Sequence, residues 1–118
     1  MSFPCQGRII WVNIPNPLGA EWKHRTAVIL TPDAEIVAGG SVTVAGISRQ
    51  SRTPTHDVLL PWHREGKVRT MLKVECYAVA YWLVTVKLED VDSDAGVVPP
   101  DEMASLLHRV TLPRPPGV

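Results

Sequence analysis

The sequence predicts a small, mainly-β barrel with one α-helix at its C-terminal end. Short segments rich in valine, isoleucine, threonine and aromatic residues recur along the chain, and prolines and glycines separate them, which is typical of strands joined by turns. Only the last part of the chain has the apolar spacing of a helix. Many short strands followed by one helix favour a barrel over a layered α/β fold. The 118 residues show no internal repeat or linker, so we expect one domain over residues 1–118.

Four segments in the first half of the chain have strand character. Each is rich in β-branched or other apolar residues and stops at a proline, a glycine pair or a polar turn. The four segments are 8–14, a second that starts around Arg25 and ends at Leu30, 42–47, and 56–60.

The run from Val68 to Leu88 is long, apolar and rich in valine, tyrosine and tryptophan. It predicts either two strands or one strongly bent strand, with the break near residues 78–80. The acidic stretch that follows, residues 89–94, is expected to form a loop.

A helix is predicted to begin at Pro99-Pro100-Asp101-Glu102, because proline suits the first helical turn and carboxylates there complement the helix dipole. Apolar residues then recur at the spacing of one helical face, which can lie across a barrel. They are Met103, Leu106, Leu107 and Val110. The proline-rich residues 111–118 cannot continue the helix, and we expect them to form a flexible tail.

Charge and composition limit the classes of function. Twelve basic residues balance twelve acidic ones, and 45% of the residues are hydrophobic, which excludes a disordered chain or a basic nucleic-acid tail. A zero net charge argues against a protein that grips duplex DNA through many phosphates, although it leaves room for a local basic cleft. Cys5 and Cys76 are too far apart for a metal or redox motif, and His56 and His63 lack ligand spacing, so no metal site is expected.

The first residues do not combine a charged region with an apolar one, and no apolar run is long enough to span a membrane. We therefore expect a cytoplasmic protein with no membrane partner and with reduced, inert cysteines.

Two stretches, Gly7–Pro15 and Gly19–Leu30, resemble the opening of PemK/MazF toxins. That opening has a glycine-led strand with a tryptophan, a loop with Gly-x-Glu, and an arginine before an apolar strand. Ile47-Ser48, Pro54-Thr55-His56 and the helix led by Asp101-Glu102 resemble later parts of the same family. The resemblance implies an SH3-like, CcdB-like β-barrel that forms a homodimer, binds a cognate antitoxin and acts on single-stranded RNA.

Two positions depart from the family pattern. Thr26 stands where a proline usually follows the arginine. The apolar stretch 72–79 occupies a region where the family often carries an aspartate and an arginine.

The resemblance implies an endoribonuclease in which the ribose 2′-hydroxyl attacks the neighbouring phosphate and leaves a cyclic phosphate, without a metal or other cofactor. Arg25 matches the family arginine, and its planar fork can donate two hydrogen bonds to phosphate oxygens. Ser48 matches a serine or threonine whose hydroxyl can donate to a non-bridging oxygen. Because the alignment across this loop is ambiguous, Arg49 and Ser51 are alternatives to Ser48.

Six further residues are candidates for substrate binding. Glu21 is expected to hold the loop or Arg25 by an ion pair, and Trp22 can stack an unpaired base. His24 is adjacent to Arg25 and, on a strand, is expected to face the opposite way. The six candidates are Glu21, Trp22, Lys23, His24, Arg49 and Arg52.

Other functions fit the same fold. The chain can be a non-catalytic toxin that poisons DNA gyrase, as the related CcdB type does, or a degenerate paralogue that only binds a partner. A small SH3-like binding module is a third possibility, since related barrels support different functions.

Overall fold

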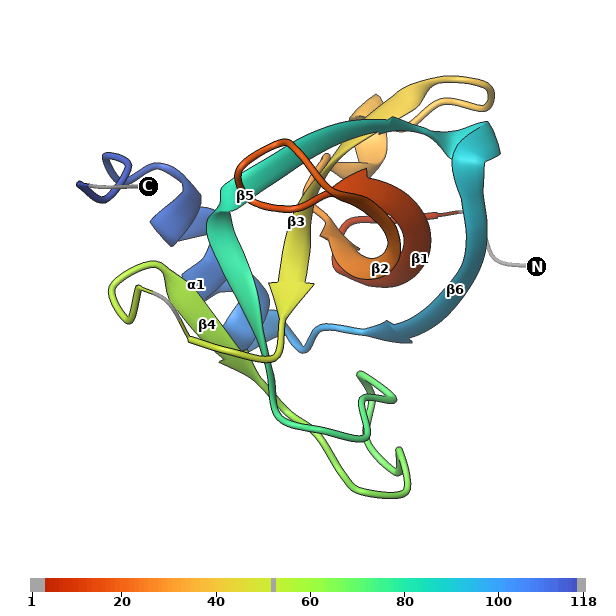
Figure 1. The fold of residues 1–118 in the computed structure, drawn as a ribbon. Coiled ribbons are helices and arrows are strands. Elements are labelled where there is room, and N and C mark those ends of the chain that lie inside the picture. The colour runs from red at the N-terminus through yellow and green to blue at the C-terminus, as the bar shows by residue number, and fades with distance from the viewer. Residues whose placement is uncertain (1–3, 52, 117–118) are drawn as a thin grey trace.

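A computed structural model of the chain describes residues 4–51 and 53–116. Figure 1 shows a curled sheet with one helix packed against it. The strands are β1 (Arg8–Pro15), β2 (Trp22–Ile29), β3 (Ser41–Ser48), β4 (Asp57–Leu60), β5 (Cys76–Lys87) and β6 (Val91–Val97). The helices are α1 (Pro100–Val110) and two single 3₁₀ turns, η1 (Asp33–Glu35) and η2 (Leu88–Asp90).

All six strands belong to one antiparallel sheet with the order β4-β5-β3-β2-β1-β6. The mainly-β class with a C-terminal helix is therefore confirmed. Strand pairing does not close the sheet within the described residues, because β4 and β6 are its two edges. Near the β6 edge, the Val97 amide donates to the Arg69 carbonyl at 2.8 Å, so the connection between β4 and β5 covers part of the gap.

The side chains of β1 show how the sheet builds two apolar layers. Ile9 packs into a layer with Met103 and Leu106 of α1, whereas Ile10, Val12 and Ile14 face the inside of the curl. Alternate strand residues point to opposite faces. Trp11 and Asn13 are exposed on the face of Ile9, so β1 contributes to both layers but is covered on that face only near its start.

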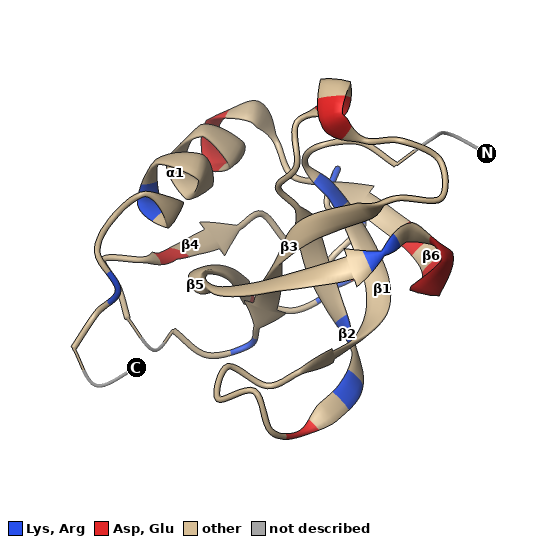
Figure 2. Cartoon of the chain, turned by 90° about the horizontal axis from the view of Figure 1, so that it is seen from above, with Lys and Arg blue, Asp and Glu red and all other residues tan. Residues whose placement is uncertain are grey.

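The helix α1 forms as the sequence predicts. Pro99 is its N-cap and Pro100 occupies the first turn. Acidic residues lie at its start and basic ones at its end, as the colours of the ribbon in Figure 2 show, and both complement the helix dipole. Met103 and Leu106 are buried against the sheet.

The second strand begins at Trp22 rather than near Arg25. Residues 22–24 are exposed, and Trp22 is the one apolar residue among them, so the segment has no alternating apolar pattern. They are extended because they pair with β1, with Pro15 opposite Trp22 and Asn13 opposite His24. Backbone pairing with a neighbouring strand here outweighs local propensity.

The acidic stretch is not a loop, and that expectation was wrong. It forms η2 and most of β6, which pairs with β1. Its charges are tolerated because they remain at the surface, and two of them lie beside a basic residue. Asp94 lies 3.9 Å from Arg8, and Asp92 contacts His24.

Of the run 68–88, only Cys76–Lys87 is a strand, and it is continuous. The pairing of β5 with β3 shifts register between Ala45, opposite Leu83, and Ile47, opposite Ala78. This bulge bends β5, which corresponds to the single bent strand of the two alternatives. The residues before β5 instead fold back on the preceding segment, with Thr70 Oγ1 donating to the Pro61 carbonyl at 2.6 Å.

The C-terminal segment contacts the body of the protein. His56 Nε2 lies 2.8 Å from the Pro113 carbonyl, and Thr55 Oγ1 lies 2.8 Å from His56 Nδ1. A carbonyl only accepts, so His56 Nε2 donates to Pro113. Residues 117–118 of the expected tail are outside the described part of the chain, and the single-domain organisation over 1–118 stays a prediction. No helix in the described ranges has the length and apolar character needed to cross a bilayer.

We expect Leu106→Ala to lower the free energy of unfolding by about 2–5 kcal/mol, because the fully buried Leu106 side chain joins α1 to the sheet and its removal leaves a cavity. Urea denaturation followed by circular dichroism measures the change. Leu18→Ala is the control: Leu18 is 82% exposed, and its loss is expected to change stability by less than about 0.5 kcal/mol. Equal stabilities of the two variants would contradict the assigned packing.

Candidate active site

A groove of about 430 Å³ lies where the β1–β2 loop approaches the C-terminal end of β3 and the middle of β5. Arg25 and Ser48, the two residues that the resemblance marks as catalytic, both line it. Its lining consists of Asn16, Pro17, Glu21, Arg25, Ile47, Ser48, Arg49, Gln50 and Trp82. Folding therefore brings together two residues that are distant in sequence.

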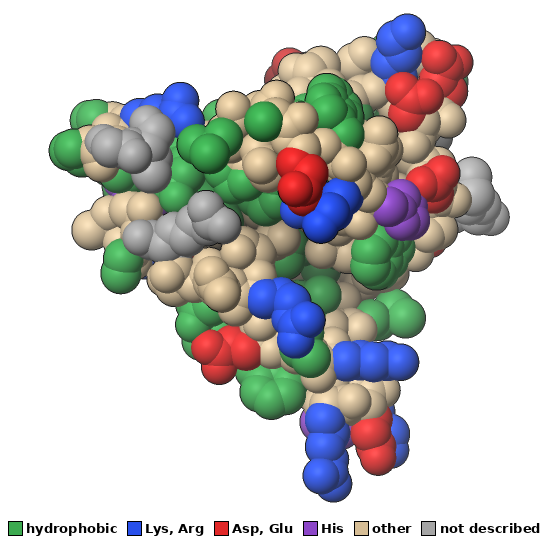
Figure 3. All heavy atoms as spheres, viewed as in Figure 1, with side chains coloured by type: hydrophobic (Ala, Val, Ile, Leu, Met, Phe, Trp, Pro, Cys, Tyr) green, Lys and Arg blue, Asp and Glu red, His purple; other side chains and the backbone are tan. Residues whose placement is uncertain are grey.

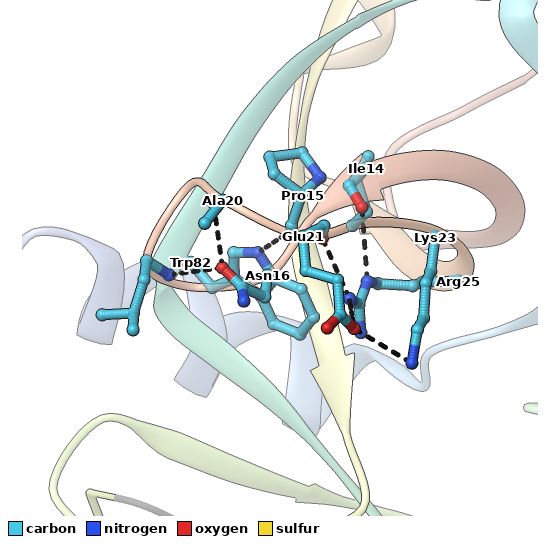
Figure 4. Close-up of polar contacts among 9 residues, drawn as sticks. Ile14, Pro15, Asn16, Ala20, Glu21, Lys23, Arg25 and Trp82 are labelled. Atoms are coloured by element: carbon cyan, nitrogen blue, oxygen red, sulfur yellow. Dashed lines mark hydrogen bonds and ion pairs between the residues drawn. The ribbon is translucent and has the colours of Figure 1, made fainter.

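The guanidinium of Arg25 is held on several sides. Its Nε donates to the Ile14 carbonyl at 3.3 Å, and its Nη2 donates to the Glu21 carbonyl at 3.1 Å. Its Cζ lies 5.6 Å from the centre of the Trp82 ring, within cation–π range. Figure 4 shows the guanidinium of Arg25 between Ile14 and Glu21. The two hydrogen bonds leave other guanidinium N–H groups for a ligand.

Glu21 carries the negative charge at the groove. Its Oε1 lies 2.9 Å from Lys23 Nζ and 3.7 Å from Arg25 Nη2, so the expected ion pair with Arg25 is present. The hydrogen bond from Lys23, together with the charges of Lys23 and Arg25, lowers the pKa of the Glu21 carboxyl below its ordinary value. Glu21 is therefore a carboxylate at neutral pH.

The β1–β2 loop is fixed by its own backbone contacts. Asn16 Oδ1 accepts from the Leu18 amide at 3.0 Å and from the Ala20 amide at 3.1 Å. The Asn16 amide donates to the Glu21 carbonyl at 2.8 Å, the same carbonyl that binds Arg25. Gly19 has φ +79°, which glycine adopts without strain. The loop thus presents a rigid carbonyl to the arginine.

Ser48 ends β3 opposite Tyr77 of β5. Its Oγ accepts a hydrogen bond from the Gln50 amide at 3.1 Å, as serine often does at a turn. The hydroxyl proton remains able to donate to a ligand. Arg49 is exposed beside it in the groove, whereas Ser51 instead donates to Asp57 Oδ2 at 3.2 Å.

The other predicted binding residues are arranged differently. Trp22 and Lys23 are exposed and are not part of the groove lining. His24 lies on the opposite face from Arg25, where its ring stacks on Trp11 at 5.2 Å and its Nε2 contacts Asp92. Strand alternation accounts for this placement. Arg52 lies outside the described residues.

Trp82 and Gly46 are site residues that the sequence reasoning missed. The Trp82 side chain is 5% exposed, and its Nε1 donates to the Pro15 carbonyl at 2.9 Å. A Cβ built on Gly46 would lie 2.2 Å from two atoms of the Trp82 ring. A glycine inside an apolar strand often marks such a close approach, and this was the available signal.

Basic side chains also gather on the connection between β4 and β5, which projects below the sheet in Figures 1 and 3. This connection carries Arg64, Lys67, Arg69 and Lys73. A second hollow, of about 530 Å³, lies beside the groove and shares Ile47 and Arg49 with it. Within residues 4–51 and 53–116, no group of three or more His, Cys, Asp and Glu side chains is placed to hold a metal ion.

These features define a small protein with one curled antiparallel sheet, a terminal helix and a groove that presents arginine, serine and glutamate. The chain belongs to the PemK-like, MazF-like toxin family of type II toxin–antitoxin systems, whose sequence model matches residues 5–112. The resemblance inferred from the sequence is thus confirmed. None of the curated proteins matches the chain.

Solved structures share this fold. MazF from Deinococcus radiodurans has a TM-score of 0.73 and 19% identity, over 93% of this chain and 94% of that one. An endoribonuclease from a mycobacterial species, solved with its cognate antitoxin, has a TM-score of 0.68 and 17% identity, over 96% and 100% of the two chains. The toxin MazF-mt6 of Mycobacterium tuberculosis has a TM-score of 0.66 and 19% identity, over 87% and 92%. At such identities the likeness establishes the fold.

We expect Lys23→Met to raise the pKa of the Glu21 carboxyl toward its ordinary value of 4.5, because the variant removes both the hydrogen bond and the cation that stabilise the carboxylate. NMR titration of the side-chain carboxyl carbon measures it. Lys67→Met, which breaks the exposed Lys67–Glu65 pair, should leave the pKa of Glu21 unchanged. An unaltered Glu21 titration in Lys23→Met would show that Lys23 does not hold this carboxylate in solution.

Proposed function

We propose that this protein is the toxin of a toxin–antitoxin pair and a sequence-selective endoribonuclease that cleaves single-stranded RNA without a metal cofactor. The observation that carries the proposal is that Arg25 and Ser48 line one groove, with guanidinium N–H groups and a hydroxyl proton available to a phosphate. Family membership supports the toxin class.

In the proposed reaction, the ribose 2′-oxygen attacks the adjacent phosphorus and the bond to the 5′-oxygen breaks. The products are a 2′,3′-cyclic phosphate and a free 5′-hydroxyl. Negative charge grows on the non-bridging oxygens in the transition state, where preorganised donors are most effective. Arg25 supplies a charged fork and Ser48 a neutral donor.

Two protons must move: one leaves the 2′-hydroxyl, and one reaches the leaving oxygen. Glu21 is the one carboxylate among the described groove residues, and it is ionised at neutral pH. We assign it as the acceptor of the 2′-proton, while solvent water in the open groove gives a proton to the leaving 5′-oxygen and the resulting hydroxide is neutralised by the proton that Glu21 took up. We assign to Arg25 an electrostatic role, because a guanidinium does not lose its proton in proteins.

RNA also needs contacts away from the cleaved bond. Arg49 lines both the groove and the neighbouring hollow. Trp11, Met71 and Val74 line the hollow only. Unpaired bases bind to apolar and aromatic surfaces beside a cationic backbone track. In our proposal Arg49 binds the phosphate next to the cleaved one, and the hollow takes a flanking base.

The remaining parts of the proposal concern partners. A second copy of the chain and a cognate antitoxin are the protein partners that the family suggests, and the mycobacterial endoribonuclease is solved with such an antitoxin. The substrate would be messenger RNA in the cytoplasm.

We expect the purified protein to cleave single-stranded RNA in excess EDTA, and Arg25→Ala to lower the rate by at least about 10²–10³-fold, because the main donor to the phosphorane is lost. Gel analysis of a labelled RNA measures both. Arg114→Ala removes an exposed arginine outside the groove and should cleave at the normal rate. Undiminished cleavage by Arg25→Ala would refute the role given to Arg25, and an inactive wild-type protein would favour a toxin that only binds its target.

Ser48→Ala should reduce cleavage about 10²-fold, since one neutral donor to the transition state is removed, whereas Ser48→Thr keeps the hydroxyl and should retain most activity. Rates under single-turnover conditions separate the two variants. The proposed role of the hydroxyl fails if alanine and threonine at this position give the same rate.

A further inference from the structure

Trp82 lies under the groove rather than on its surface. It is 5% exposed on the bent strand β5, yet it belongs to the groove lining. A side chain this buried cannot offer its face to an RNA base in the way an exposed tryptophan does. Its available face is instead turned to Arg25, whose Cζ is 5.6 Å from the ring centre.

The ring position is set from below by β3. Gly46 leaves space that any side chain would fill, because a Cβ there would lie 2.2 Å from Trp82 Cδ2 and Cε3. Gly46 pairs with Ala27 of β2 at the register shift between β3 and β5. The indole is therefore seated on the backbone of the same strand that ends in Ser48.

The edge of the ring is fixed from the side by β1. Trp82 Nε1 donates to the Pro15 carbonyl at 2.9 Å, while Arg25 Nε donates to the carbonyl of the preceding residue, Ile14, at 3.3 Å. The indole and the guanidinium thus hold two consecutive carbonyls at the end of β1. Figure 4 shows the indole N–H directed at Pro15 and the guanidinium at Ile14.

Together these contacts define where the arginine fork can lie. The Trp82 face restricts it on one side, and the Ile14 and Glu21 carbonyls restrict it on another. A guanidinium over an aromatic ring keeps its charge and its in-plane N–H donors. Preorganised donors stabilise a transition state without a reorganisation cost.

We infer that Trp82 is a positioning residue: seated on Gly46 and bonded to Pro15, it holds the Arg25 guanidinium in the orientation that meets the scissile phosphate. This inference rests on the proposed nuclease function of Arg25. It assigns to Trp82 no contact with RNA.

The kinetic test compares Trp82→Phe, Trp82→Leu and Leu83→Ala on a short RNA that contains one cleavage site. Leu83 is the neighbour of Trp82 on β5, lies outside the groove lining and is 44% exposed, so its variant controls for changes in the strand. Phenylalanine keeps a ring face without the N–H, and leucine removes both. We expect kcat to fall about 2- to 5-fold in Trp82→Phe and about 10- to 30-fold in Trp82→Leu, with KM within about twofold. Leu83→Ala should change neither.

Two kinetic results would overturn the inference. One is a wild-type kcat in Trp82→Leu. The other is a rise in KM at unchanged kcat, which would indicate direct stacking of Trp82 on the RNA. Circular dichroism confirms folding of each variant at the assay temperature, and Trp82→Phe carries the test if Trp82→Leu does not fold.

An NMR measurement tests the positioning without reference to activity. The Arg25 Nε–Hε signal, assigned by its loss in Arg25→Lys, should be shifted by the indole ring current in the wild type, and it should move in Trp82→Leu but not in Leu83→Ala. An Arg25 signal that is the same in Trp82→Leu and wild type would refute the inference. The wild type and all variants could fail to cleave RNA although the Arg25 signal moves as expected. In that case the nuclease proposal fails and the positioning of Arg25 by Trp82 stands.

Discussion

The close contact between the Trp82 indole and the backbone at Gly46 joins the core of this protein to its groove. It is possible only because β3 lacks a side chain at that point and because β5 bends where its register with β3 shifts. The same indole bonds to the end of β1. Three strands from separate parts of the sequence therefore meet at one ring, and the groove residues are arranged around it.

A partly buried cation loses hydration that other contacts must replace, and several weak contacts do this for Arg25. Its side chain is 22% exposed, so some of its hydration is lost. Two backbone carbonyls, the Trp82 ring and the more distant Glu21 carboxylate replace that hydration. Among the described residues, none pairs with the guanidinium in a short bidentate ion pair. This arrangement suits a group that must still bind an anion, since a tightly paired arginine would have less to offer a phosphate.

The charged side chains at the surface are divided between the two faces of the sheet. The acidic strand β6 contacts Arg8 of β1 and, on the outer face of β2, His24, whereas Arg25 and Arg49 face the groove. Neighbouring residues on β2 point to opposite faces. A chain of zero net charge can therefore present a locally basic groove, and net charge alone says little about whether such a protein binds RNA.

The sequence by itself determined the class of fold, the terminal helix and the family. Apolar periodicity, the positions of the prolines and the Gly19–Arg25 motif are all features of short segments, which can be read without the tertiary structure. It also placed Arg25 and His24 on opposite faces. Only the tertiary structure decided that the acidic stretch becomes β6, that β5 is one bent strand, and that Trp82 lies beneath Arg25. These features depend on which strand lies next to which, and pairing between distant segments outweighs the local preferences that a sequence displays.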